Sequence, residues 1–181
     1  MGERSFDNYW GDRTESQYRR DMCIPYVAAF DDFDSQKNVA SVARCVVLAN
    51  VTTDLIIHAD RADVRNVGTF LINSALLNEG PMPVPESVIG ALGSESVALE
   101  ALERAIQGPQ FPEESKEILL LIIERRQRAD EDRNIPRSII FKGLRKYRKL
   151  MKSASDNGEI DPTFCSVLNR ISYFYRKQGS H

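Results

Sequence analysis

The chain has 181 residues, of which 42% are hydrophobic and 28% charged, with a formal net charge of −2. This length suits a single domain with a buried core, and the composition is ordinary for a globular protein. No apolar run approaches a membrane span and no N-terminal apolar segment is typical of a secretory signal, so we expect an intracellular protein, cytoplasmic or nuclear.

The cysteines and histidines are too few and too scattered to indicate a disulfide framework or a metal centre. Cys23, Cys45 and Cys165 are odd in number and widely spaced, which is typical of reduced intracellular thiols. His58 is the single histidine besides His181, and Gly179-Ser180-His181 resembles the start of a purification tag. We therefore expect neither a metal site nor a cofactor.

Residues 1–22 are predicted to form an N-terminal arm, flexible or docked, ahead of a single helical domain over residues 23–178. The arm is polar and lacks helical or alternating periodicity, yet it carries four aromatic side chains, Phe6, Tyr9, Trp10 and Tyr18. Two interpretations are open. The arm docks on its own domain, which we favour, or it contacts a second copy of the chain.

The first half of the domain contains one ambiguous stretch, residues 39–58. Apolar residues on one face predict a helix over residues 37–50, which Ser35 can cap. Thr52 or Thr53, as an N-cap, would open a second helix directly after it. We favour two helices. A β-hairpin over residues 39–58, which would make the fold α+β, is the alternative because β-branched residues are frequent there.

Four further segments before residue 130 have apolar residues at helical spacing. They are residues 62–80, with Gly80 as the C-terminal stop; residues 85–92; residues 95–108, capped by Ser94; and residues 109–130, with Pro112 in the first turn. Residues 119–123 are apolar almost all round, so we expect this last segment to be the central buried helix.

Two helices are predicted at the C-terminal end, the first from Pro136 to about Ala154 and the second from Pro162, preceded by a turn at Gly158. Their predicted core stripes are Ile140, Leu144, Tyr147 and Met151 in the first helix, and Phe164, Leu168, Ile171 and Tyr175 in the second. The fold class that follows is all-α, a compact bundle of six or seven short helices.

Charge is divided unevenly along the chain. Residues 1–136 hold 14 basic and 23 acidic residues, whereas residues 137–181 hold 10 basic and 3 acidic ones. Away from the core stripe, the first C-terminal helix carries six cationic side chains, Lys142, Arg145, Lys146, Arg148, Lys149 and Lys152. Like charges at i, i+4 oppose a helix, so this face needs a compensating anion outside the helix.

Two sources of that anion are about equally supported. One is an acidic segment of the same chain, residues 31–34 or 129–132. The other is a nucleic acid, whose phosphates pair with lysine and arginine. The last helix adds a second row, Arg170, Tyr173, Arg176 and Lys177, and such mixed aromatic and cationic residues suit single-stranded nucleic acid. A membrane surface is less favoured, because the apolar face of the basic helix is needed for the core.

No catalytic motif is found in the sequence. Cys23 or Cys45 could pair with His58 as a nucleophile and base, but a lone histidine in an apolar run is more often a structural residue. We therefore expect that the protein is not an enzyme.

The sequence predicts a non-enzymatic helical binding protein, of the nucleocapsid-associated, packaging or transcription-cofactor type, whose C-terminal basic surface contacts RNA or single-stranded nucleic acid. The six cationic residues of the first C-terminal helix and the second row are the predicted contacts. The alternative is a protein-interaction module, an adaptor or effector that binds another protein or a second copy through its aromatic arm and charged surfaces.

Overall fold

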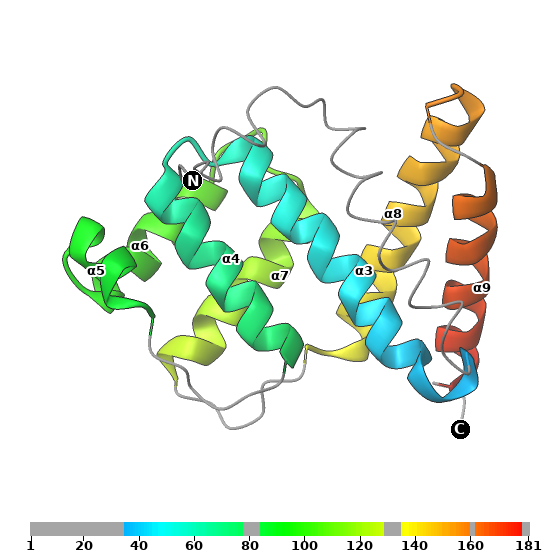
Figure 1. Cartoon of the computed structure of the whole chain (residues 1–181), viewed down its shortest axis with the longest axis horizontal. Helices are drawn as coiled ribbons and strands as arrows, with labels where there is room; N and C mark the ends of the chain where they lie inside the picture. The colour runs from blue at the N-terminus through cyan, green and yellow to red at the C-terminus, as the bar shows by residue number, and fades with distance from the viewer. Residues whose placement is uncertain (1–34, 78–83, 129–134, 160–161, 179–181) are drawn as a thin grey trace, which may run out of the picture.

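The computed structural model describes residues 35–77, 84–128, 135–159 and 162–178, and every secondary-structure element in these ranges is a helix (Figure 1). The helices are α3 (Ser35–His58), α4 (Ala62–Leu77), α5 (Glu86–Leu92), α6 (Glu95–Ile106), α7 (Glu113–Gln127), α8 (Arg137–Asp156) and α9 (Pro162–Gln178). The all-α prediction is confirmed, and the alternative hairpin over residues 39–58 is wrong. None of these described helices combines the length and apolar character needed to cross a membrane.

Several predicted features lie outside the described residues. These are the N-terminal arm with Phe6, Tyr9, Trp10 and Tyr18, the acidic segments 31–34 and 129–132, Cys23, Gly80, and the last three residues.

Helix α3 is one continuous helix rather than the predicted pair, and Thr52 and Thr53 lie in its interior instead of at an N-cap. Their hydroxyls donate to the backbone carbonyls of Leu48 and Ala49, each at 2.9 Å. A threonine hydroxyl that bonds the preceding turn can be buried in a helix without losing its hydrogen bond. The two threonines therefore neither start a helix nor favour a strand here.

Helix α3 is also the central helix, a position that we predicted for residues 119–123 of α7. It contacts α4, α6, α7, α8 and α9. All ten residues from 46 to 55 are buried, and they span more than two turns, so every side of the helix is covered in this stretch. In α7, by contrast, Leu120 and Leu121 are only partly buried.

The other helices form two groups on either side of α3 (Figure 1). Helices α4 to α7 lie on one side, and α8 and α9 lie on the other. Helix α9 runs antiparallel to α8 after a turn at Gly158, whose φ of 74° requires a left-handed backbone, as predicted for a turn glycine. The start of α8 therefore meets the end of α9, where the guanidinium of Arg137 lies 4.3 Å from the centroid of the Tyr175 ring.

Helix starts follow the sequence signals closely. Ser94 caps α6, as predicted, with its hydroxyl accepting a hydrogen bond from the amide of Val97 at 3.2 Å. Pro85, Pro112 and Pro136 occupy the N-cap positions of α5, α7 and α8. A missing amide hydrogen costs nothing at a helix start, because the first amides have no partner within the helix.

Two glycines allow close helix packing. A Cβ atom at Gly68 of α4 would lie 2.2 Å from Leu55 Cδ2 in α3 and 3.2 Å from Leu102 Cδ1 in α6. A Cβ at Gly143 of α8 would lie 3.0 Å from Val47 Cγ1 in α3. The bulk of an ordinary side chain would therefore push α4 or α8 away from the central helix.

Replacing Gly68 by alanine should lower the free energy of unfolding by about 1–3 kcal/mol, although alanine favours helices, because the fully buried Leu55 has no open space into which to move. Urea unfolding measures the effect. Gly90→Ala in α5 is the matched control, because a Cβ there meets nothing within 4 Å, and it should leave stability unchanged or raise it by up to about 1 kcal/mol. A Gly68→Ala protein as stable as the wild type would contradict this account of the packing.

Candidate nucleic-acid interface

Helix α8 has the two faces that the sequence predicts. Its predicted core stripe, Ile140, Leu144, Tyr147 and Met151, is at most 2% exposed. The cationic residues lie on the other side, where Lys142, Arg145, Lys149 and Lys152 are exposed and Lys146 and Arg148 are partly buried at the flanks. The predicted cationic face is therefore a surface of the folded chain.

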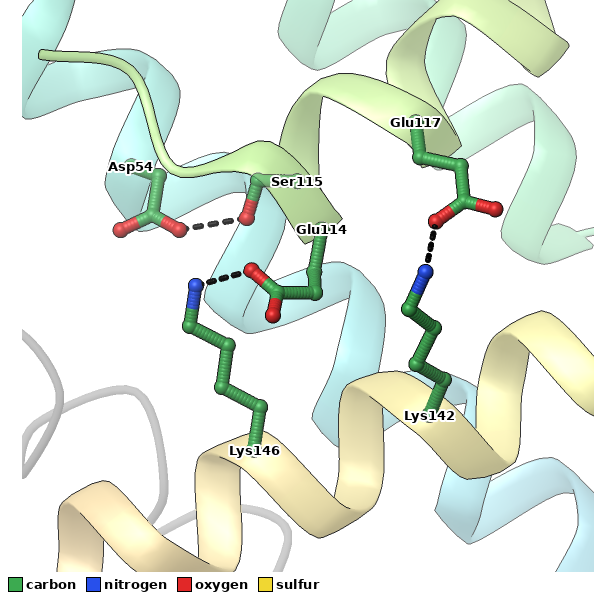
Figure 2. Close-up of polar contacts among 6 residues, drawn as sticks. All are labelled: Asp54, Glu114, Ser115, Glu117, Lys142 and Lys146. Carbon is green, nitrogen blue, oxygen red and sulfur yellow. Dashed lines mark hydrogen bonds and ion pairs between the residues drawn. The ribbon is translucent and has the colours of Figure 1, made fainter.

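Two of these six cations are paired with carboxylates of α7 (Figure 2). The ammonium of Lys142 donates to the carboxylate of Glu117 at 2.7 Å, and that of Lys146 donates to the carboxylate of Glu114. Part of the compensating negative charge thus lies within the chain. This negative charge comes from carboxylates of α7, which the sequence did not indicate as partners of α8.

In each ion pair one residue has a shifted pKa, Glu114 in the pair with Lys146 and Lys142 in the pair with Glu117. Burial by itself would raise the pKa of the Glu114 carboxyl, but the hydrogen bond from Lys146 and one from a backbone amide hold it below its usual value. The hydrogen bond and charge of Glu117 raise the pKa of Lys142 above its usual value. Both shifts favour the charged forms of Glu114 and Lys142.

A buried polar contact fixes the start of α7 beside these pairs. The hydroxyl of Ser115 donates to the carboxylate of Asp54 in α3 at 2.5 Å, and the two residues are 2% and 1% exposed. Ser115 points toward α3 while its neighbour Glu114 points toward α8 (Figure 2). The buried bond therefore helps to place Glu114 within reach of Lys146.

The remaining cations of α8 differ in how far they are neutralised. Lys152 pairs with Asp156 of its own helix at 3.1 Å, and both side chains are exposed. Within the described ranges, Arg145, Arg148 and Lys149 have no ion pair. The available positive charge of α8 is thus concentrated away from α7, on the middle of the exposed face and on the side of α9.

A pocket of about 190 Å³ lies between α8 and α9 and joins the two predicted rows. Its lining residues are Phe141, Arg148, Asn169, Ser172, Tyr173 and Arg176. Tyr173 is 52% exposed and makes an edge-to-face contact with Phe174 at 5.6 Å between ring centroids. Of the predicted second row, Tyr173 and Arg176 therefore lie beside Arg148, whereas Arg170 and Lys177 are exposed but do not line the pocket.

Sequence reasoning missed Asn169 and Ser172 as members of this site. A signal was present, because residues 169, 172, 173 and 176 have the i, i+3, i+4, i+7 spacing of one helix face. The hydroxyl oxygen of Ser172 is buried and has no hydrogen-bond partner in the part of the chain that the structure describes.

A second cationic pocket, of about 350 Å³, lies near the start of α8 and includes Arg44, Arg125, Arg137 and Tyr175. Burial raises the pKa of the Tyr175 hydroxyl, and the charges of Arg137 and Arg44 oppose this shift. Arg137 donates a hydrogen bond to the backbone carbonyl of Tyr175, and Arg44 and Arg125 also have contacts within the protein. Arg137 thereby joins the start of α8 to the end of α9, and all three arginines already have contacts within the protein.

Of the two thiols considered as partners of His58, Cys23 lies outside the described residues and Cys45 does not lie near His58. Cys45 and His58 are 13 residues apart in the single helix α3, which corresponds to about 20 Å along its axis. Burial raises the pKa of the Cys45 thiol, with Arg44 and its own backbone opposing, so the reactive thiolate is disfavoured. His58 instead packs edge-to-face on Phe111, with ring centroids 5.7 Å apart. Among the described residues, no group of histidine, cysteine or acidic side chains could hold a metal ion.

Comparisons with protein families, with curated proteins and with solved structures each found no match to this chain. The assignment of the site therefore depends on its geometry and charge.

Replacing Ser115 by alanine should lower the free energy of unfolding by about 1–3 kcal/mol, because the buried carboxylate of Asp54 would lose a hydrogen bond. Chemical denaturation provides the measurement. Ser74→Ala is the control, since the buried Ser74 hydroxyl only donates to the carbonyl of Phe70 in its own helix, and its loss should cost less. Equal losses in the two variants would show that the bond between α3 and α7 has no special weight.

A double-mutant cycle should detect the pair between helices α7 and α8. We expect Glu114→Gln and Lys146→Met to show a coupling energy of about 0.5–1 kcal/mol at neutral pH and low salt, because the side chains are about 30% exposed. The lowered pKa of Glu114 means that this coupling is complete above the ordinary glutamate pKa and is lost as pH falls through the folded-state value.

The matched control for this cycle is the exposed pair of Lys152 and Asp156, for which Lys152→Met and Asp156→Asn should give no more than about 0.5 kcal/mol. A larger coupling in the control pair would contradict the importance given to the contact between α7 and α8.

Proposed function

We propose that this chain is a non-enzymatic binding protein that works inside the cell and contacts RNA or single-stranded nucleic acid through a surface of α8 and α9. One observation carries the proposal. Arg145 and Lys149, which have no ion pair among the described residues, lie on the same helix as Arg148. Arg148 in turn shares a pocket with Arg176 and the exposed ring of Tyr173.

This combination fits the chemistry of an unpaired strand. Lysine and arginine neutralise phosphates and release condensed counterions, which supplies most of the affinity for nucleic acid. An exposed aromatic ring can stack on a base, whose face is accessible only when the strand is unpaired. Phosphate pairing and base stacking together are the usual means by which proteins hold single strands.

The geometry ranks the predicted phosphate contacts. Arg145 and Lys149 come first because they are exposed and have no ion pair in the described ranges. Lys142 and Lys146 would have to leave Glu117 and Glu114 before binding a phosphate, so we expect them to contribute less. Lys152, Arg170 and Lys177 extend the cationic surface at its edges.

An acidic protein is the second candidate partner, because Lys142 and Lys146 already bind carboxylates on this surface. A partner that presents aspartate and glutamate side chains would meet the same cations. The aromatic arm of residues 1–22 belongs to this alternative as the proposed contact to a second protein or a second copy.

Reversing the two leading charges with Arg145→Glu and Lys149→Glu should weaken binding to a single-stranded oligonucleotide by about 10-fold or more at low salt. The plot of log affinity against log salt should become shallower by about 1.4, since each lost phosphate contact removes about 0.7. Fluorescence anisotropy with a labelled RNA of about 20 nucleotides measures both quantities.

The matched control is the double variant Arg104→Glu and Arg128→Glu, which changes the net charge equally at exposed positions of α6 and at the end of α7. It should retain most of the affinity. If both double variants lose affinity equally, net charge rather than the α8 surface governs binding, and the proposal fails. Binding of an acidic protein but not of RNA would favour the second candidate.

A further inference from the structure

We infer that the pocket between α8 and α9 receives one unpaired base of the bound strand, and that this pocket makes the surface selective for single-stranded over double-stranded nucleic acid. The inference rests on the proposed function and names the group that occupies one part of its site. It depends on the size of the pocket, its mixed chemistry and one unsatisfied buried hydroxyl.

The pocket has the dimensions of a site for a part of a larger ligand. Its volume of about 190 Å³ is below the range of roughly 300–1,000 Å³ typical of pockets that enclose whole small molecules. It lies beside the exposed cationic face of α8, to which Arg148 belongs. A strand whose phosphates follow that face can therefore place a base in the pocket without leaving the cations.

The lining residues divide into groups that suit the parts of a nucleotide. Phe141 is half-buried and Tyr173 is exposed, so the two rings offer apolar contact to the flat face of a base. Arg148 supplies positive charge for an adjoining phosphate, and Arg176, which also has a contact within the protein, adds to the positive potential of the pocket. Asn169 adds an amide that can both donate and accept at a base edge.

Ser172 provides an independent sign that the pocket can accept a polar group. The residue lines the pocket and is 5% exposed, and its hydroxyl oxygen has no hydrogen-bond partner among the described residues. Buried polar groups in proteins are nearly always bonded, and an exception is often explained by a bound molecule. A polar base edge that entered the pocket, with a small shift of the side chains, would give this hydroxyl a partner.

Other ligands explain fewer of these features. An inorganic anion or an acidic peptide would use Arg148 and Arg176 but would leave the rings of Phe141 and Tyr173 without a role. A duplex presents its phosphates to the cations of α8 but keeps its bases stacked inside the helix, so it cannot fill the pocket. The pocket therefore discriminates single-stranded from double-stranded nucleic acid by the availability of an unpaired base rather than by charge.

The experiment compares a labelled mixed-sequence RNA of about 20 nucleotides with the duplex that it forms with its complement. The wild-type protein should bind the single strand more tightly than the duplex. Tyr173→Ala should weaken single-strand binding by about 10-fold and leave duplex binding nearly unchanged, because stacking is lost while charge is retained. Tyr173→Phe keeps the ring and should restore single-strand affinity.

Ser172→Ala supplies a second readout that a purely structural role would not produce. The hydroxyl has no partner in the described structure, so its removal should leave thermal stability unchanged or raise it. Single-strand affinity should nevertheless fall several-fold, because the base edge loses a hydrogen bond. Unchanged affinity in both Ser172→Ala and Tyr173→Ala would overturn the pocket as a base site.

The failure of this inference and that of the proposed function are distinguishable. If Tyr173→Ala binds single strands normally while the Arg145→Glu, Lys149→Glu protein does not, the cationic surface stands and the pocket inference is wrong. If the wild-type protein binds the single strand and the duplex with equal affinity, the pocket inference is likewise wrong and the cationic surface stands. If neither variant loses affinity, or the wild-type protein binds no RNA, both proposals fail.

Discussion

The burial of α3 on all sides is the constraint on which the rest of the structure depends. A helix that contacts five others must present apolar side chains in every direction, and from Val42 to Leu55 it does so almost without interruption. Three of the buried polar groups in this stretch have hydrogen-bond partners, whereas the buried Oδ1 atom of Asn50 has none in the described structure. Thr52 and Thr53 bond to their own helix, and Asp54 bonds to Ser115 of α7. The core thereby determines where α7 begins.

The position of α7 then determines how charge is distributed on α8. Each residue turns a helix by about 100°, so Lys146 is rotated about 100° from Arg145 in one direction and Arg148 about 60° in the other. The first direction faces α7, where Glu114 neutralises Lys146. The second faces α9, where Arg148 joins Tyr173 in the pocket. Helix α8 thus has one flank whose charge is neutralised and one flank that borders a pocket. The two flanks differ because one packs against α7 and the other against α9.

The parts of this arrangement that depend on local periodicity could be predicted from the sequence. The core stripe of α8 and the cap at Ser94 are examples, because spacing and side-chain chemistry within one helix suffice to specify them. The parts that depend on packing between helices could not. The partners Glu117 and Lys142 are 25 residues apart, and only the placement of α7 against α8 brings them together. The continuity of α3 through Thr52 was missed because burial, not intrinsic propensity, decides the state of a β-branched segment.

The contrast between the two cationic pockets supports the distinction between structural and binding arginines. At the start of α8, Arg137 lies over the ring of Tyr175 and bonds its backbone carbonyl, so its charge serves to join the ends of α8 and α9. About three turns further along α8, Arg148 lines a pocket without an ion pair in the described ranges, next to a tyrosine ring that is half exposed. An arginine and a tyrosine thus contact each other in one pocket, whereas the arginine and tyrosine of the other pocket leave it open. An arginine and a tyrosine that make no such contact with each other retain the charge and the ring face that a ligand can use. The proposed binding site is for this reason at Arg148 and Tyr173 rather than at Arg137 and Tyr175.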